Sequence, residues 1–346
     1  MKIDVEECAP VIIPTLCRYE HFKRCVESLQ KNDYAKYTDL YIGLDYPAKE
    51  AHVQGHDKIK EYLSKGIKGF KNVVIIEHDS NVGSSANAKK IKEEAFLKHD
   101  KYIFTEDDNE FAPNYLEYMN KCLIKYKDDP SVQAITGYRY PHVECKVNGN
   151  VFASQIYYAA FGCGTWKSKM QNMFETLTVP YFEQLYTNGQ FMKELRNVSP
   201  NQYCNFVKGM LGYTKLVQGG KIWRCDMIYG IYMFSQGKRM IFPQISKVRN
   251  HGYDGTGINC GDLNYNSNKR ITHRNFDISC QVLDSNSAFD EINEEKELKQ
   301  IEVEKMLEQF FEIPAKELMR TEIAYLISKI IGLTNTRKLI QLMYKK

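Results

Sequence analysis

Short apolar runs alternate with amphipathic stretches over the first 140 residues of the chain. Four of these runs predict strands, at residues 11–13, 40–44, 73–76 and 102–104, with Pro14 ending the first. Stretches with helical spacing lie between them, at 21–29, around 59–63, and from Ser84 or Ser85, as the helix cap, to 97. Because continuously apolar strands alternate with helices, the pattern predicts βαβ units and a mostly parallel sheet covered on both faces.

The pattern changes twice in the rest of the chain. From about 151 to 280 it is less regular and rich in aromatic residues, Gly and Asn, with helical stretches near 181–195 and 202–211. From Phe289 onward, Glu and Lys dominate, with apolar residues at helical spacing. This last part predicts two or three helices and no strand.

These changes set the expected domain organisation. A length of 346 residues corresponds to about two ordinary domains. The pattern instead predicts one large α/β domain over residues 1–284, in two halves at 1–140 and 141–284, and a helical extension over 285–346.

Composition and charge exclude several classes of protein. Hydrophobic residues make up 43% of the chain and charged residues 26%, which excludes a disordered chain or a small disulfide scaffold. The net charge of +4, from 47 basic and 43 acidic residues, is too balanced for a dedicated nucleic-acid binder. We therefore expect a folded protein without a nucleic-acid partner.

The cysteines and the ends of the chain bear on its compartment. The ten cysteines stand singly, without a Cys-x-x-Cys pair, which excludes a zinc ribbon or a thioredoxin motif. The sequence shows neither a signal peptide nor an apolar run of about 18 residues. These observations predict a cytoplasmic protein whose cysteines are reduced and mostly buried.

An acidic run, Glu106-Asp107-Asp108-Asn109-Glu110, directly follows the predicted strand at 102–104. Ligands of open α/β sheets bind at the carboxyl ends of strands, and carboxylates so close together repel one another unless a cation relieves them. Mg²⁺ and Mn²⁺ bind few carboxylates and complete their shell with phosphate oxygens and water. The run therefore predicts a metal–diphosphate site, with a plain solvated loop as the alternative.

The same segment carries a resemblance to a known family. Glu106-Asp107-Asp108 matches the DXD element of GT-A glycosyltransferases in its Glu-Asp-Asp form, and residues 111–118 resemble the continuation into a helix. Over about residues 10–262 the chain resembles family 2 of these enzymes, found in bacterial polysaccharide synthesis. It is also similar to the N-acetylglucosaminyltransferases that initiate complex N-glycans.

The resemblance implies a fold and an activity. The fold is GT-A, with a mixed, mostly parallel central sheet, a nucleotide-sugar-binding half at 1–140 and an acceptor-binding half at 141–284. The activity is metal-dependent transfer of a sugar from a nucleotide-diphosphate sugar, expected to be a UDP-sugar, to a hydroxyl of a glycan. In-line attack would invert the anomeric centre.

Donor contacts are implied at the opening loop, at the end of the second strand and at an Asn-x-Gly turn. The residues concerned are Thr15, Arg18, Asp45, Asn81, Ser84 and Asn87. A helix N-terminus favours anions, which supports the turn as part of a diphosphate site. A structural role stays open for each segment: a helix cap for Arg18, a turn residue for Asp45, and a turn with a cap at 81–87.

The metal, Mn²⁺ or Mg²⁺, is expected on Asp108, assisted by Asp107 or Glu106 through water. Glu106 and Asp107 are also expected to contact the donor. In many relatives a C-terminal loop, here 248–260, ends in a His that reaches the metal or the diphosphate. Asn259 stands at that position and His251 stands earlier. Either His251 binds the metal or the metal has no nitrogen ligand.

The catalytic base and the acceptor site come from the second half of the chain. Asp226 resembles the family's catalytic acid before a helix and is our candidate base, with an N-cap as its alternative or additional role. Gly164 and Trp166, in the segment 161–166, match a stretch near the acceptor. Core packing is the alternative for Trp166.

Two questions about partners and function stay open. Residues 322–333 are largely apolar and basic residues follow, so the C-terminal helices contact a membrane surface that carries a lipid-linked acceptor, or they pack on the main domain or a second subunit. A nucleotidyltransferase is disfavoured because the loop at 14–18 has no Gly. A non-catalytic nucleotide-sugar or glycan-binding protein remains the other alternative, because Asn259 replaces the His.

Overall fold

The structure is a computed structural model that describes residues 2–141, 143, 147–214, 216–257, 278, 281–284, 289, 291–311 and 313–344. Its strands are β1 Val11–Thr15, β2 Asp39–Leu44, β3 Asn72–Glu77, β4 Lys101–Phe104, β5 Asn109–Phe111, β6 Val132–Thr136, β7 Val151–Ser154, β8 Cys163–Trp166, β9 Val217–Gln218, β10 Lys221–Ile222, β11 Arg239–Pro243 and β12 Val248–Asn250.

An eight-stranded sheet with the order β3-β2-β1-β4-β8-β6-β11-β7 forms the centre of the molecule. The strands β3, β2, β1 and β4 are parallel neighbours, and so are β6 and β11. The strand β8 runs antiparallel to β4 and to β6, and β7 runs antiparallel to β11. The predicted α/β fold with a mixed, mostly parallel sheet is confirmed.

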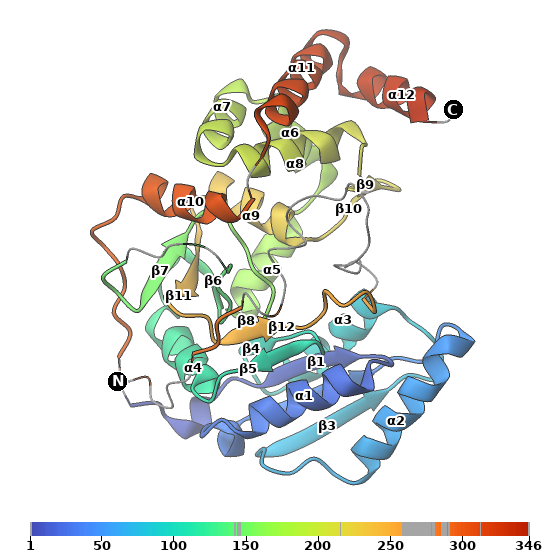
Figure 1. Cartoon of the computed structure of the whole chain (residues 1–346), viewed down its shortest axis with the longest axis vertical. Helices are drawn as coiled ribbons and strands as arrows, with labels where there is room; N and C mark the ends of the chain where they lie inside the picture. The colour runs from blue at the N-terminus through green and yellow to red at the C-terminus, as the bar shows by residue number, and fades with distance from the viewer. Residues whose placement is uncertain are drawn as a thin grey trace.

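Helices surround this sheet and extend beyond it (Figure 1). They are α1 Tyr19–Gln30, α2 Val53–Ser64, α3 Ser84–Ala95, α4 Tyr115–Lys125, α5 Lys167–Thr176, α6 Val179–Thr187, α7 Gly189–Val198, α8 Pro200–Leu211, α9 Asp226–Ser235, α10 Gln300–Glu308, α11 Ala315–Ile331 and α12 Leu333–Tyr344. Figure 1 shows α11 and α12 at the end of the molecule opposite to β3 and α2.

Different helices cover the two faces of the sheet at β1. On one face, Val11 and Ile13 belong to the same buried cluster as Phe22 of α1. On the other face, Ile12 packs in a cluster with Ile91 of α3. Successive side chains of a strand point to opposite faces, so the continuous apolar run of β1 buries both, as the pattern predicts.

The first strand is longer than predicted, because Pro14 lies inside β1 and pairs with Gly43. Residues of β1 bond alternately to its two neighbours, and Ile12 O accepts from Thr105 N on the β4 side at 3.1 Å. Pro14 therefore faces the β4 side as well, where the pairing between β1 and β4 has already ended at Phe104. A proline without N–H costs no ladder bond at that position.

The start of α3 also differs from the prediction. Neither serine caps the helix: Gly83 is the N-cap with a φ of 81°, and Ser84 is the first helical residue. A positive φ favours glycine, which has no Cβ to clash. The conformation is needed because Gly83 N donates to Asp45 Oδ2 at 2.9 Å across the turn.

The C-terminal segment is helical, as predicted, and α10 packs against the sheet domain. Its Leu307 is completely buried in the main hydrophobic cluster. Its Glu304 is also completely buried and accepts from Ser154 Oγ at 2.7 Å and Gln155 N at 2.6 Å. One turn later, Glu308 accepts from Asn201 N at 2.7 Å. The two carboxylates thus attach α10 to β7 and to α8.

The described cysteines are all free thiols: Cys8, Cys17, Cys25, Cys122, Cys163, Cys204 and Cys225. Burial raises the pKa of Cys8 to about 11, which makes that thiol a poor nucleophile. In the part of the chain that the structure describes, no helix is long and apolar enough to cross a membrane.

Candidate active site

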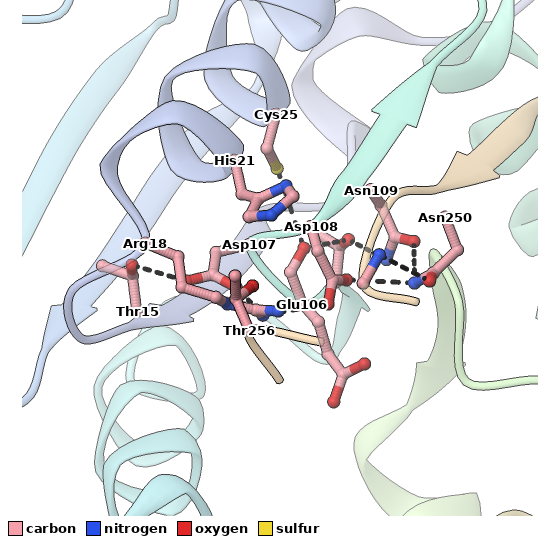
Figure 2. A network of polar contacts seen from close by, with 12 residues as sticks. Thr15, Arg18, His21, Cys25, Glu106, Asp107, Asp108, Asn109, Asn250 and Thr256 are labelled. Atoms are coloured by element: carbon pink, nitrogen blue, oxygen red, sulfur yellow. Dashed lines mark hydrogen bonds and ion pairs between the residues drawn. The ribbon is translucent and has the colours of Figure 1, made fainter. Parts of the chain in front are cut away.

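The acidic run forms a turn after β4, at the carboxyl end of the parallel part of the sheet. The side chains of Asp107 and Asp108 are buried. Arg18, in the loop after β1, binds both: its Nη2 lies 2.9 Å from Asp108 Oδ2 and also pairs with Asp107. Thr15 Oγ1, at the end of β1, donates to Asp107 Oδ2 at 2.8 Å. Figure 2 shows these side chains meeting beside the acidic turn.

One guanidinium faces an excess of carboxylates at this turn. Burial opposes the charge of Arg18, but Asp107 and Asp108 outweigh it and raise the pKa of Arg18. At Asp107 the balance is reversed, because burial outweighs Arg18 and raises the pKa of the carboxyl. Among the residues that the structure describes, Arg18 is thus the one cation paired with Asp107 and Asp108, and it does not fully compensate them.

Glu106 is the third acid of this turn. Figure 2 shows its side chain extending away from the group of Arg18, Asp107 and Asp108. The residue is exposed at the surface, and its carboxyl is nevertheless desolvated by the protein around it. This desolvation, together with the charges of Asp108 and Asp226, raises the pKa of Glu106 to about 8. An added cation would relieve the repulsion and lower this pKa.

A short antiparallel pair, β5 with β12, fixes the acidic turn from the other side. Asn250 Nδ2 donates to Asp108 Oδ1 and to Asn109 Oδ1, each at 3.0 Å, and His251 N donates to Asp108 O at 2.8 Å. A Cβ at Gly252 would collide with the Asp108 carboxylate. The segment around β12 thus holds Asp108 closely, and glycine is required for that approach.

The ring of His251 is turned to a different acid. Its Nε2 lies 2.9 Å from Glu110 Oε2, and this hydrogen bond lowers the pKa of Glu110. The imidazole of His251, which was predicted to bind the metal, therefore pairs with Glu110 and not with the Asp108 carboxylate. Asn259, the other residue considered for this role, lies outside the described residues.

The fit of the acidic turn to a metal rests on the chemistry of its donors. No group of three or more His, Cys, Asp or Glu side chains placed to hold an ion occurs among the described residues. Carboxylate oxygens with uncompensated charge nevertheless suit a hard divalent cation. Such an ion takes one or two carboxylates and fills its shell with diphosphate oxygens and water, so the donor chemistry of Asp108 is compatible with it.

The carboxylate of Asp45 accepts hydrogen bonds from the Asn-x-Gly turn at residues 81–83. This buried carboxylate accepts from Tyr46 N and Val82 N at Oδ1, and from Gly83 N at Oδ2, each at 2.9 Å. Asn81 Nδ2 approaches Oδ2 at 3.2 Å. The structure therefore brings together Asp45 and Asn81, two of the residues predicted to contact the nucleotide-sugar donor. A uracil ring would have to share or displace one of these four donors.

The other two residues of this turn differ in exposure. Asn87 is 1% exposed, and its Nδ2 donates to Gly43 O at 2.9 Å, which ties α3 to β2. A Cβ at Gly43 would clash with the Asn87 side chain, so the contact needs glycine in the strand. Ser84 is exposed at the first turn of α3, where its side chain is open to a ligand.

Asp226 is the first residue of α9, and Cys225 is the N-cap, so the predicted N-cap role is wrong. Its carboxylate is half-buried, and Oδ2 accepts from Ala160 N at 3.3 Å. Burial raises the pKa of Asp226 to about 7, although the Ala160 N–H stabilises the charged form. A carboxylate with this pKa is suited to general base catalysis near neutral pH.

The sheet register brings Asp226 to the acidic turn. Ala160, its partner, lies three residues before Cys163, and Cys163 pairs with Phe104 at the end of β4. Glu106 follows Phe104 by two residues. The effect of the Asp226 charge on the pKa of Glu106 agrees with this neighbourhood. Carboxylates 120 positions apart in the sequence thus share one end of the sheet.

The two predicted acceptor residues lie in the packed interior. Trp166 pairs with Lys101, at the opposite end of β4 from the acidic turn, is 3% exposed, and stacks under the Lys169 ammonium at 3.9 Å. A Cβ at Gly164 would press on Met119 of α4. The structure therefore does not bring Trp166 and Gly164 to the carboxylates.

Three side chains near the site were missed as individual candidates. Trp223 is 55% exposed and stands three residues before Asp226, so it offers an open aromatic face. Lys92 lies over the Phe104 ring at 4.7 Å, and burial lowers its pKa to about 8. Arg224 lies over the Phe174 ring at 4.1 Å. The aromatic segment before Asp226 could have indicated Trp223 as a candidate. Nothing in the sequence around Lys92 indicates that it lies near the site.

In comparisons with known proteins, the chain matched solved structures but no family model and no curated sequence. The chain is similar to S. aureus TarS 1-349 in complex with UDP-GlcNAc, at 13% identity and a TM-score of 0.35 over 47% of this chain and 46% of that one. It is similar to the mannosyltransferase PcManGT from Pyrobaculum calidifontis with GDP-Man and Mn²⁺, at 10% identity and a TM-score of 0.34 over 50% and 48%.

A third similar structure is GalNAc-T7 with UDP, GalNAc and Mn²⁺, at 13% identity and a TM-score of 0.40 over 70% of this chain and 44% of that one. The chain spans less than half the length of each of these solved chains. The resemblance to GT-A glycosyltransferases found in the sequence recurs among these structures. At TM-scores this low they decide nothing about activity, which has to be argued from the site.

Proposed function

We propose that this protein is a metal-dependent glycosyltransferase that moves a sugar from a nucleotide-diphosphate sugar, in our proposal a UDP-sugar, to a hydroxyl of a glycan. The observation that carries the proposal is the meeting of two separate carboxylate sites at one end of the sheet. The turn with Asp107 and Asp108 supplies the site for a charged donor. Asp226, with a pKa of about 7, supplies a base beside it.

The donor would lie against the loop after β1 and the acidic turn. Asp108 would hold Mn²⁺ or Mg²⁺, with Asp107 and Glu106 reached through water. The ion, when bound, offsets the charge that develops on the leaving diphosphate. Arg18 lies at the same carboxylates and carries a positive charge that can turn to the diphosphate when an ion takes its place. Thr15 keeps Asp107 oriented through its hydrogen bond.

The acceptor hydroxyl would lose its proton to Asp226. The Ala160 N–H fixes one oxygen of the carboxylate, which leaves the other for the hydroxyl. The position of Asp226 in the first turn of α9 stabilises its ionised form through the helix dipole. Attack from the side opposite to the diphosphate inverts the anomeric centre. Trp223, exposed next to this base, would stack on a sugar ring of the acceptor.

The proposal extends to a setting in the cell. We place the protein in the cytoplasm, at the inner face of the cell membrane, with an acceptor of bacterial surface polysaccharide synthesis carried on a membrane lipid. The seven described cysteines, all free, agree with a reducing compartment.

A donor screen tests the activity. Purified protein is incubated with a panel of UDP- and GDP-sugars and Mn²⁺, and release of the nucleoside diphosphate is measured with and without glycan acceptors. We expect slow hydrolysis of one donor, stimulated by acceptor and abolished in Asp226→Asn. The exposed Asp128→Asn serves as the matched control and keeps full activity. Tight binding of a donor without any turnover would support the alternative of a non-catalytic binding protein.

A further inference from the structure

The helix α11 leaves most of its large apolar side chains exposed to solvent, whereas Leu318, Ala324 and Tyr325 pack against the protein. Its buried residues are Thr321, Tyr325 and Ser328. Ser328 Oγ lies 2.7 Å from Tyr186 Oη, and Tyr325 Oη donates to Tyr186 O at 3.3 Å. The helix is thus attached through hydroxyl groups and the Tyr325 ring, while its larger aliphatic side chains lie outside the contact, unlike those of a usual amphipathic surface helix.

The outward face of α11 is a continuous apolar stripe. Its members are Met319, Ile323, Leu326, Ile327, Ile330 and Ile331, exposed by 54%, 50%, 57%, 43%, 83% and 39%. At about 100° per residue, these six positions fall within an arc of about 140° along about 18 Å of helix. A contiguous patch of this kind on a soluble protein indicates a surface that is covered in use.

The charges around the stripe are positive. Lys316 and Arg320 lie in the same arc, at the beginning of the helix, and are exposed. The two acids of α11 face the other way: Glu317 pairs with Lys208 and Glu322 pairs with Arg196. In the described part of the chain, no ion pair neutralises Lys316 or Arg320.

The sequence around the stripe continues this charge bias. From Ile323 to the last residue there is no Asp or Glu, whereas Lys329, Lys338, Lys345 and Lys346 are basic. Arg337 is basic as well but pairs with Glu183 of α6. A second copy of this chain would bring the same positive charge to the contact, without acids to pair with it. An anionic lipid surface supplies both the apolar phase for the stripe and the negative charge for its border.

A hollow at the beginning of α11 fits the same partner. It has a volume of about 560 Å³, lies between α8 and α11, and is lined by residues that include Leu211, Tyr213, Lys316 and Arg320. The lining also includes Glu317, whose carboxylate pairs with Lys208. A phosphate head group would find Lys316 and Arg320 there, with its acyl chains beside the stripe. A spanning orientation is excluded for α11, which has 17 residues and is too short and too polar to cross a bilayer.

We propose that α11 is an interfacial helix by which the protein binds, without spanning, a bilayer that contains anionic lipid. The stripe enters the boundary between head groups and acyl chains, and Lys316 and Arg320 lie at the phosphates. Figure 1 places α11 at the end of the molecule opposite to β3, so the bilayer would meet that end and leave the β1–β3 edge in water. The proposal does not depend on the proposed transferase activity.

Vesicle flotation of the full chain tests this surface. We expect the protein to float with vesicles of phosphatidylcholine containing about one third phosphatidylglycerol, and much less with phosphatidylcholine alone. Raising the salt from about 0.1 M to about 0.5 M should weaken the binding several-fold. The double variant Leu326→Gln/Ile330→Gln should bind at least about tenfold more weakly, because two apolar side chains leave the interface.

Matched controls make the result specific. Leu97→Gln alters a leucine on the loop after α3 that is more exposed than Leu326, and Lys89→Gln/Lys90→Gln alters two exposed lysines of α3. Both should bind like the wild type, whereas Lys316→Gln/Arg320→Gln should lose the preference for anionic lipid. Thermal unfolding confirms that each variant is folded, as expected for substitutions at exposed positions.

Three outcomes would overturn the proposal. The wild type fails to float with anionic vesicles, or it floats equally well when Leu326 and Ile330 are replaced. The third is a concentration-dependent dimer, seen in sedimentation velocity without lipid and lost in Leu326→Gln/Ile330→Gln, which would assign the stripe to a second copy. A donor screen without turnover would affect none of these readouts, so failure of the transferase proposal is separate.

Discussion

Arg18 Nη2 lies 2.9 Å from Asp108 Oδ2, in a contact that joins the loop after β1 to the acidic turn after β4. The same guanidinium pairs with Asp107. Arg18 is the cation that these two buried carboxylates share among the described residues, beside their hydrogen bonds from Thr15 and Asn250. In the free protein Arg18 thus occupies the place that a metal ion would take beside these acids. Replacing Arg18 therefore tests whether a metal binds there.

Replacing Arg18 by Gln should destabilise the protein by about 3 kcal/mol in EDTA, because buried carboxylates lose their partner. Added Mn²⁺ should restore a substantial part of this loss, because the ion binds the folded state alone. Urea unfolding with and without Mn²⁺ measures both effects. Arg196→Gln removes a half-exposed ion pair with Glu322 and should cost under about 1 kcal/mol, with no response to Mn²⁺. An Arg18 variant that Mn²⁺ does not rescue would argue against a metal at Asp108.

The pKa of about 7 at Asp226 predicts how activity depends on pH. A base works in its ionised form, so kcat/KM should fall about tenfold per pH unit below about 7 and level off above it. Asp226→Asn should lose a factor of about 10²–10⁴ in turnover while donor affinity stays unchanged. A steady-state pH profile gives the first quantity and titration calorimetry the second. A profile that is flat from pH 5 to pH 8 in the wild type would remove Asp226 from this role.

Glu304 predicts a pH dependence of stability that is independent of the site. Burial raises its pKa in the folded protein to about 7, from an ordinary value of 4.5. The folded state therefore keeps its proton over a range in which the unfolded state has lost it. The group stabilises the fold below about pH 4.5, and this contribution, about 3 kcal/mol, is lost as the pH rises to 7.

Urea unfolding between pH 5 and pH 8 should show this loss in the wild type and a flatter curve in Glu304→Gln. The matched variant Glu302→Gln changes an exposed carboxylate on the same helix and should keep the wild-type slope. Equal slopes in all three proteins would show that Glu304 is ionised in the folded state.

The two tryptophans should separate acceptor binding from packing. Trp223 is exposed beside Asp226, so Trp223→Ala should raise the acceptor KM about tenfold, as one stacking contact is lost, with little change in stability. Trp166 is buried, so Trp166→Ala should lower the free energy of unfolding by about 3–5 kcal/mol. Acceptor kinetics and urea unfolding of both variants are the measurements. An acceptor KM that rises in the Trp166 variant alone would return the stacking role to Trp166.

The first half of the fold was accessible from the sequence because each element is defined locally. The strands β1, β2 and β4 bury both faces, so their apolar runs are continuous, and the intervening helices carry one apolar face each. The apolar run of β3 is continuous as well, although this edge strand is only partly buried. The sequence predicted that Pro14 ends the first strand. The sheet accepts a proline at this position only because the pairing of β1 with β4 has already ended beside it. That condition is set by a neighbour that is distant in sequence.

The site was only partly accessible for the same reason. The acidic run stood out because four acids in five residues follow an apolar strand. The pairing of Arg18 with Asp107 and Asp108 joins positions about 90 apart, and the β5–β12 ladder joins two three-residue strands with no pattern of their own. The sequence also pointed to Trp166 and not to Trp223 as an acceptor residue. Nothing near either residue in the sequence tells which of the two the fold buries.

Metal-dependent binding of the nucleotide is the central claim, and titration calorimetry of UDP in the presence of Mn²⁺ tests it most directly. Wild type and Asp128→Asn should bind UDP with equal affinity when Mn²⁺ is present and far more weakly in EDTA. Asp108→Asn should bind UDP equally weakly in both conditions, because its carboxylate is the proposed ligand of the ion. Unchanged Mn²⁺-dependent affinity in Asp108→Asn would contradict the account.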